Sequence, residues 1–428
     1  MTALSDFVQL DSRQASLVID CTSNTPAIAY FGKRLNEQTS FDMLQLLLTR
    51  QEAKCAVVVE APISLSPSMG EGFTGGPGIE LNNDTNAWSI GGKLKKIEQL
   101  NSQEVRFESF DEVRKLTLSH VIKLDEATNV ISASTALLND SETAVGVNYC
   151  AAPTIPMPDH ITKLMSFEGR WSNEFHRNTI DLFLGSVLRE NRKGKTSHDS
   201  FPGAILHEQY TNESQGECYG FHLGWSGNHR TRIELLPEQR TYIQMGELLM
   251  PSEITLQPGE AYTSPTLYCS YSQAGFSSLS NNFHQFVRTQ ILTAKQQAKP
   301  RPVHYNTWEG IYFDHNVDTL KALADRVASL GVERFVLDDG WFKGRRGDYA
   351  GLGDWTVDYA IYPEGLSPII DHVNSLGMEF GIWFEPEMVN PDSDLYRAHP
   401  DWVLGTQGNE QLQFRHQLVL DLSRTQVT

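Results

Sequence analysis

Paired acidic residues that directly follow short apolar runs are the part of this 428-residue sequence best suited to chemistry. Asp338 and Asp339 follow the run Arg-Phe-Val-Leu and precede Gly340 and Trp341. Neighbouring side chains on a strand point in opposite directions, so both carboxylates can face one ligand only where the strand breaks into a loop, which Gly340 permits. Two carboxylates beside tryptophans suit hydrogen bonding to the hydroxyl groups of a sugar, with indole as an apolar platform. The alternatives are a metal site and a solvated turn, and no His at suitable spacing supports a metal.

Glu385 and Glu387 form a second acidic pair, in the segment Trp-Phe-Glu-Pro-Glu. Residues i and i+2 on one face of a strand lie at a separation close to the ~5–5.5 Å that retaining glycosidases keep between their carboxyl groups. Pro386 disturbs the strand, however, and both acids would approach a sugar from one side, whereas the reaction needs them on opposite faces of the ring. We therefore expect a structural or supporting role for this pair.

Arg415 precedes the last apolar run of the chain and offers a charged fork of donors. Such a fork could bind a hydroxyl or a carboxylate at the mouth of a site. Equally, Arg415 could pair with Asp421 or with an acid in a loop. Both interpretations stay open from the sequence.

Residues 301–428 alternate between strand and helix patterns, which predicts a parallel α/β domain. Strands are expected at 303–308, 333–341, 378–387 and 416–423, with helices at 317–331, 367–377 and 392–400. Polar groups suited to chemistry stand at the ends of these strands, which favours a (β/α)8 barrel over an open doubly wound sheet. About four of the eight βα units fit before Thr428, and a half-barrel would leave unpaired strand edges. We therefore expect the natural chain to continue.

Residues 1–276 predict a large N-terminal β-sandwich domain. They contain short runs rich in Val, Ile, Thr, Phe and Tyr that alternate with period two and are separated by turn clusters. Residues 277–300 space their apolar side chains at helical intervals and read as a linking helix and linker. The predicted fold class is therefore multidomain β plus α/β, a sandwich followed by the first half of a (β/α)8 TIM barrel.

Composition narrows the possible partners. The chain has 35 Lys and Arg against 53 Asp and Glu, a net charge of −18, which disfavours nucleic acid and anionic membrane surfaces. The five cysteines are widely spaced, with no zinc motif and no compact disulfide framework, and predict buried free thiols. We expect no metal and no cofactor. With no leader-like N-terminus and no long apolar stretch, we expect a cytoplasmic location.

Several long motifs resemble glycoside hydrolase family 36 α-galactosidases. They are RPVHYNTWEGIYFD, VLDDGWF, LGDW, FGIWFEPEMVNPDSDLYRAHPDW and HQLVLDLSR, with EGRWSNE, LQPGE and GFSSLSNNFHQFVR before them. The resemblance covers residues 168–428 well and the first 160 residues loosely. It implies a β-sandwich, a catalytic (β/α)8 barrel and a small C-terminal β-domain, and retaining hydrolysis of terminal α-linked galactose from small galactosides such as melibiose or raffinose.

The resemblance also implies roles for single residues. Asp338 and Asp339 would bind galactose hydroxyls, Trp308 and Trp383 would wall the pocket, and Arg415 would complete its rim. Bacterial relatives often form tetramers through an N-terminal loop, but the corresponding SPSMGEGFTGGPG lacks the family's Tyr and Asp, so a homo-oligomer is a weaker expectation.

The family's catalytic carboxylates have no counterpart in the barrel segment. The nucleophile is an Asp in a Lys-x-Asp motif, and the only such motif here, Lys123 to Asp125, lies in the sandwich region. We therefore expect both catalytic residues beyond Thr428 and an inactive fragment. A non-catalytic galactose-binding protein and a galactosyl-transferring relative remain the alternatives.

Overall fold

The computed structural model describes residues 6–23, 25–48, 61–82, 90–196, 199–406, 408–409 and 411–427. The chain divides into two compact units, Met1–Thr293 and Ala294–Thr428. The first unit is built from antiparallel sheets, and the second alternates strands with helices. The division falls inside the segment 277–300, which the sequence assigned to a linker.

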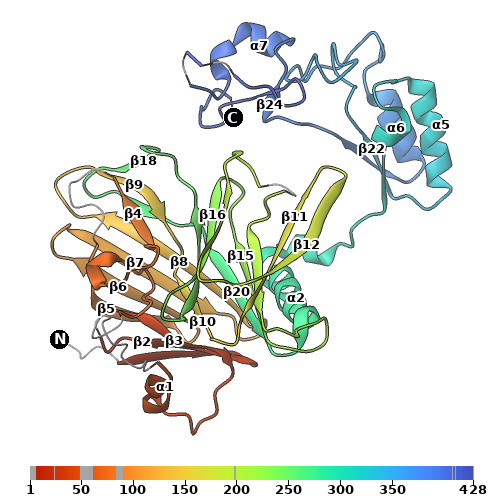
Figure 1. Cartoon of the computed structure of the whole chain (residues 1–428). Coiled ribbons are helices and arrows are strands. Elements are labelled where there is room, and N and C mark those ends of the chain that lie inside the picture. Colours follow the sequence, from red (N-terminus) through yellow and green to blue (C-terminus); the bar gives the residue numbers. More distant parts are fainter. Residues whose placement is uncertain are drawn as a thin grey trace. The chain divides into compact units, whose positions relative to one another are not determined.

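Antiparallel sheets make up the first unit (Figure 1). Within the described residues, the largest sheet contains ten strands: β5 (Lys93–Asn101), β6 (Glu104–Asp111), β7 (Leu116–Leu124), β8 (Val130–Asn139), β11 (Lys163–Arg170), β12 (Asn173–Asp181), β14 (Gly203–His207), β15 (Cys218–Leu223), β19 (Ala261–Thr263) and β20 (Leu267–Ser272). A second sheet joins β10 (Ile155–Met157), β13 (Gly185–Asn191), β16 (His229–Leu235) and β17 (Thr241–Glu247). Smaller sheets join β1 (Phe7–Asp11), β2 (Ala15–Asp20) and β3 (Ala27–Lys33), and β4 (Ile79–Leu81), β9 (Val145–Cys150) and β18 (Ile254–Leu256). The unit also holds α1 (Phe41–Leu48), a 3-10 turn (Met69–Glu71) and α2 (Gly275–Phe286).

Side-chain alternation explains the two-layer packing of the first unit. Burial alternates residue by residue along β6 and β7, as expected for strands with one face toward a core. The inward residues Phe107 and Ile122 join one hydrophobic core with Ile233 and Ile243 of the second sheet. The predicted β-sandwich is confirmed.

The linking helix is interrupted. α2 is followed by a π-helical turn at Val287–Ile291, an extended residue at Leu292 and the short α3 (Ala294–Ala298). Phe276 and Leu279 of α2 are buried against the sandwich. The helical segments are therefore divided: α2 and the π-helical turn fall in the first unit, and α3 falls in the second.

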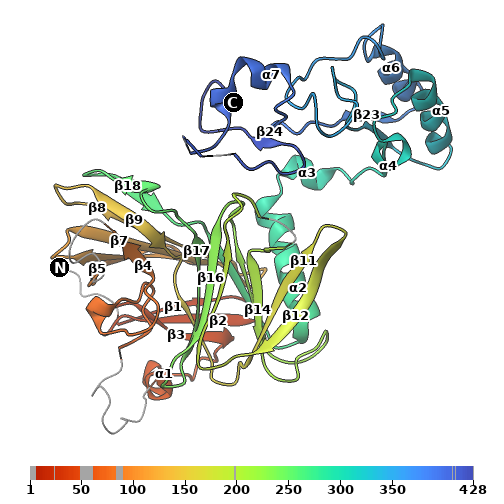
Figure 2. The same cartoon turned by 45° about the horizontal axis from the view of Figure 1, so that its top comes forward.

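A parallel sheet with helices forms the start of the second unit (Figure 2). Strands β21 (His304–Asn306), β22 (Arg334–Leu337) and β23 (Glu379–Ile382) pair in that order, and α4 (Trp308–Ile311), α5 (Val317–Ala328) and α6 (Ser367–Ser375) lie between them in the chain. Leu320 of α5 and Val373 of α6 share a core with Phe335 and Leu337 of β22. This strand and helix alternation is the beginning of a barrel, as predicted.

The fourth predicted strand differs from expectation. Residues 416–423 contribute only β25 (Leu418–Val419), which pairs antiparallel with β24 (Met388–Val389) instead of extending the parallel sheet. Leu418 and Leu420 form a separate small core with Val389 and Val403. Between β24 and β25 lie α7 (Asp394–Ala398) and a 3-10 turn (Pro400–Trp402). The apolar residues of 416–423 therefore pack against nearby segments of the same unit, Met388–Val389 and Val403, and do not join the parallel sheet.

Candidate functional site

The Asp338–Asp339 pair lies directly after β22, the central strand of the parallel sheet, and both side chains are buried, with 8% and 4% exposed. Gly340 has a φ of 115°, so the strand breaks at the predicted position. The Asp338 carboxylate accepts hydrogen bonds from the Asn306 side chain and from the backbone N–H of Asp339. The backbone N–H of Asp338 donates to Thr307 Oγ1 at 3.0 Å. The turn is therefore fixed on both sides by the end of β21.

Arg345 binds the second carboxylate. Its Nε and Nη2 donate to the two oxygens of Asp339 at 2.8 and 2.7 Å, a fork-to-fork ion pair with Arg345 fully buried. Arg345 Nη1 donates to Asn390 Oδ1 at 2.8 Å and to the Ala350 carbonyl at 3.1 Å. Sequence reasoning missed this partner, because the Gly-Arg-Arg-Gly segment is typical of a surface loop.

Asn390 connects this ion pair to the Arg415 turn. Its Nδ2 donates to the carbonyl of His416 at 2.8 Å. Arg415 and His416 both have positive φ, and Phe414 and Gln417 exchange two backbone hydrogen bonds across them. Arg415 itself is exposed. The structure therefore brings Arg415 and the aspartates to opposite ends of one hydrogen-bonded network.

The two predicted tryptophans, Trp308 and Trp383, lie at the ends of the strands on either side of β22. Trp308 opens α4, and its backbone N–H donates to Oδ1 of Asn306, whose side-chain amide also donates to Asp338. Trp383 follows β23, and its backbone N–H donates to the Leu337 carbonyl at 2.9 Å. Both rings are half-buried among other aromatics. The five predicted site residues are thus joined to one another through Asn306, Leu337, Arg345 and Asn390.

Glu385 lies half-buried beside this network, with Gln417 Nε2 donating to it at 3.4 Å. Burial raises the pKa of Glu385, and the charge of Glu387 raises it further, against the opposing effect of Arg415. A carboxyl whose charged form is disfavoured in this way suits a supporting role, which stays a prediction. Asp421, the alternative partner of Arg415, instead accepts hydrogen bonds from Ser423 and Arg424.

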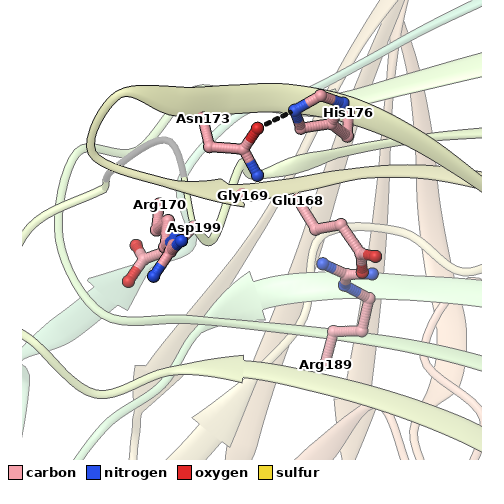
Figure 3. Close-up of a pocket in the computed structure, with 7 residues that line it drawn as sticks. All are labelled: Glu168, Gly169, Arg170, Asn173, His176, Arg189 and Asp199. Atoms are coloured by element: carbon pink, nitrogen blue, oxygen red, sulfur yellow. Dashed lines mark hydrogen bonds between the residues drawn. The ribbon is translucent and has the colours of Figure 1, made fainter.

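A separate hollow of about 530 Å³ lies in the first unit (Figure 3). Its walls come from the β11–β12 hairpin, from β13 and from the loop at Asp199, and they carry charges of both signs: Glu168, Gly169, Arg170, Asn173, His176, Arg189 and Asp199. His176 Nε2 and Asn173 Oδ1, both on β12, are 2.6 Å apart. None of the predicted sugar-binding residues lines this hollow.

Three further observations concern chemistry and location. Within the described parts of the chain, no group of three His, Cys, Asp or Glu side chains is arranged to hold a metal ion. No helix in those parts is both long and apolar enough to cross a membrane. Four cysteines, Cys21, Cys150, Cys218 and Cys269, are free and buried as predicted, and Cys55 lies outside the described residues.

Comparison with known proteins finds two glycosidase family models that together match most of residues 24–428. The glycosyl hydrolase family 36 N-terminal domain matches residues 24–257, and the melibiase family matches residues 261–428. An α-galactosidase of Escherichia coli is 40% identical over 98% of this chain, which spans 58% of that relative's length.

Solved structures agree. The galactosidase domain of the α-galactosidase–sucrose kinase AgaSK superposes with a TM-score of 0.91 at 29% identity, covering 99% of this chain and 62% of that one. A variant of the α-galactosidase AgaA from Geobacillus stearothermophilus, in complex with raffinose, gives a TM-score of 0.90 at 29% identity, covering 98% and 62%. On these matches, and on a sandwich followed by the start of a barrel, the chain belongs to glycoside hydrolase family 36.

Proposed function

We propose that the protein is an α-galactosidase that removes terminal α-linked galactose, with retention, from small galactosides of the melibiose and raffinose type. The observation that carries this proposal is the buried Asp338–Asp339 turn at the carboxyl end of the central parallel strand. Ligands of barrel enzymes bind at that end of the strands. Family membership and the AgaA complex with raffinose support the same substrate class.

The proposed roles follow from the chemistry of the side chains. A carboxylate has about four lone-pair positions, and Arg345 occupies two of those on Asp339, so others stay available for sugar hydroxyls. The ion pair fixes the orientation of the carboxylate before the sugar arrives, which lowers the entropy lost on binding. Trp308 and Trp383 would pack against the apolar faces of the galactose ring, and Arg415 would donate from the rim.

We propose that the nucleophile and the proton donor come from sequence beyond Thr428. The test compares the chain ending at Thr428 with the full gene product in the hydrolysis of p-nitrophenyl α-galactoside. The full product is expected to release p-nitrophenol and the shorter chain is not, because the covalent and acid/base steps need carboxylates that the shorter chain lacks. Activity of the shorter chain would overturn this assignment.

Galactose binding tests the roles of the aspartates separately. Asp338→Asn keeps the shape but removes a charged acceptor, and is expected to weaken galactose affinity roughly tenfold or more in calorimetry. The matched control is Glu364→Gln, an exposed acid in the same unit, which should leave the affinity unchanged. Equal affinity of wild type and Asp338→Asn would contradict the proposed binding role.

We also propose a cytoplasmic location and a homo-oligomer. The four free buried thiols support a reducing compartment, because disulfides persist mainly in oxidising ones. Fractionation of cells would test the first proposal, and light scattering of the full gene product would test the second.

A further inference from the structure

Asn390 lies between the two parts of the proposed galactose site. It follows β24 directly, is fully buried, and uses both ends of its side-chain amide. Its Oδ1 accepts from Arg345 and from the backbone N–H of Leu352, at 2.8 and 3.0 Å. Its Nδ2 donates to the carbonyls of Asp348 and His416, at 3.1 and 2.8 Å. All four hydrogen-bonding positions of the amide are therefore used.

The Oδ1 end of this amide contacts the guanidinium that binds Asp339. Arg345 is fully buried and donates to Asp339, to Asn390 and to the Ala350 carbonyl. A planar guanidinium fixes the relative directions of the groups that it binds, so the plane of Asn390 and the carboxylate plane of Asp339 are set together.

The Nδ2 end contacts the turn that carries Arg415. The turn that carries Arg415 has φ values of 52° at Arg415 and 61° at His416, in the left-handed region that side chains disfavour. Such a conformation persists only where surrounding contacts impose it. The hydrogen bond from Asn390 to the His416 carbonyl is one of these contacts, and the two backbone hydrogen bonds between Phe414 and Gln417 are two more.

We propose that Asn390 is a positioning residue that sets the rim guanidinium of Arg415 against the carboxylates of Asp338 and Asp339. No hydrogen bond or ion pair described in the structure joins Arg415 directly to Asp338 or Asp339. The hydrogen-bonded path between them runs through Arg345 and Asn390, and their spacing depends on that path. This inference rests on the proposed function, because it concerns the same galactose site.

Asn390→Asp is the informative variant. The new carboxylate still accepts from Arg345 and Leu352, but it cannot donate to the carbonyls of Asp348 and His416. The change therefore breaks the links to Asp348 and to the Arg415 turn and keeps the link to Arg345. We expect the full gene product carrying this change to show a KM for p-nitrophenyl α-galactoside raised roughly tenfold, with kcat within about twofold of wild type. Galactose affinity should fall by a similar factor.

A double-mutant cycle separates positioning from general destabilisation. If Asn390 acts through Arg415, then Asn390→Asp should raise KM less than about twofold in a protein that already carries Arg415→Gln. Asn316→Ala serves as the stability control, because the described hydrogen bonds of its side chain come from the N–H groups of Asp318 and Thr319 at the start of α5, and none of them goes to the network. It should lower Tm without changing KM.

Two results would overturn the inference. One is an unchanged KM in Asn390→Asp, with or without a lowered Tm. The other is the same increase in KM in the presence and absence of Arg415→Gln. Titration of the same proteins with galactose keeps the two proposals distinct. A wild type that binds galactose without hydrolysing the substrate contradicts the proposed function, and the binding cycle still decides the role of Asn390. A wild type that neither binds nor hydrolyses overturns both.

Discussion

Two neighbouring strands of the second unit end in acidic pairs, and the structure treats the two pairs differently. Asp338 and Asp339 follow the central strand β22, are nearly inaccessible, and are held by Asn306 and Arg345. Glu385 and Glu387 follow β23, whose residues are half-buried or exposed. Of this second pair, only Glu385 has a side-chain hydrogen bond described, a long one from Gln417. A similar sequence pattern therefore gives one fixed pair and one loosely held pair.

The difference shows what burial demands of a carboxylate. A buried charge is tolerated when an opposite charge and hydrogen bonds compensate for the lost water, as Arg345 does for Asp339. Glu385 has no ion pair among the described residues. Burial raises its pKa, and the charges of Arg415 and Arg345 only oppose that rise. Neutralising an acid of the first pair should therefore lower the free energy of unfolding strongly, and neutralising one of the second pair should change it little.

The largest effect is expected for Asp339→Asn. This change leaves the fully buried guanidinium of Arg345 without its counter-charge, and should lower the free energy of unfolding by about 3–5 kcal/mol. Urea unfolding followed by tryptophan fluorescence measures it in the second unit, which contains Trp308, Trp341, Trp355, Trp383 and Trp402.

Glu387→Gln is the matched control from the second pair. Glu387 is exposed, so its neutralisation should change the free energy of unfolding by no more than about 0.5 kcal/mol. Similar losses for Asp339→Asn and Glu387→Gln would show that the two strand ends do not differ in the way described.

An intermediate effect is expected for Gly340→Ala, which tests the turn itself. A Cβ at Gly340 would lie 2.8 Å from Nε2 of His315, a buried ring whose Nδ1 is 2.7 Å from Tyr362 Oη. Residue 340 also has a φ of 115°, a backbone conformation that alanine disfavours. The clash and the backbone strain together should lower the free energy of unfolding by about 1–3 kcal/mol. Gly377→Ala isolates the backbone contribution, because Gly377 also has positive φ but no atom within 4 Å of the added Cβ. A loss no larger at Gly340 than at Gly377 would exclude the steric contribution of His315.

Local patterns were sufficient to predict the turn but not its partners. The run before Asp338 and the glycine after Asp339 are adjacent in sequence, so strand, break and carboxylates could be read together. Arg345 lies in a segment that looks like a polar loop, and Asn390 is 45 positions from Arg345 and 26 from His416. Such a network depends on long-range packing, which one sequence does not display.

The prediction that residues 416–423 form a fourth parallel strand was wrong for a related reason. An apolar run predicts that a segment is buried, but it does not predict which segment it pairs with. Leu418 and Val419 pair with Val389 and Met388, antiparallel to them. The helices α5 and α6 were predictable because each carries its own apolar spacing and a glycine, Gly331 or Gly377, shortly after its end.

Among the changes at buried or half-buried positions, the smallest effect is expected for Glu385→Gln, and it depends on pH. The pKa of Glu385 is raised in the folded protein above its unfolded value of about 4.3, so folding favours the neutral carboxyl. The stability that this neutral form provides is complete below about pH 4.3 and is lost as the pH rises through the raised pKa. Glutamine stays neutral throughout, so the variant should gain slightly on wild type between about pH 4 and pH 7, by less than about 1 kcal/mol because the side chain is half-exposed. Paired urea unfolding curves at both pH values measure the gain, with Glu364→Gln as an exposed control. A gain at pH 7 that is equal for Glu385→Gln and the control would mean that burial does not distinguish Glu385 from an ordinary surface acid.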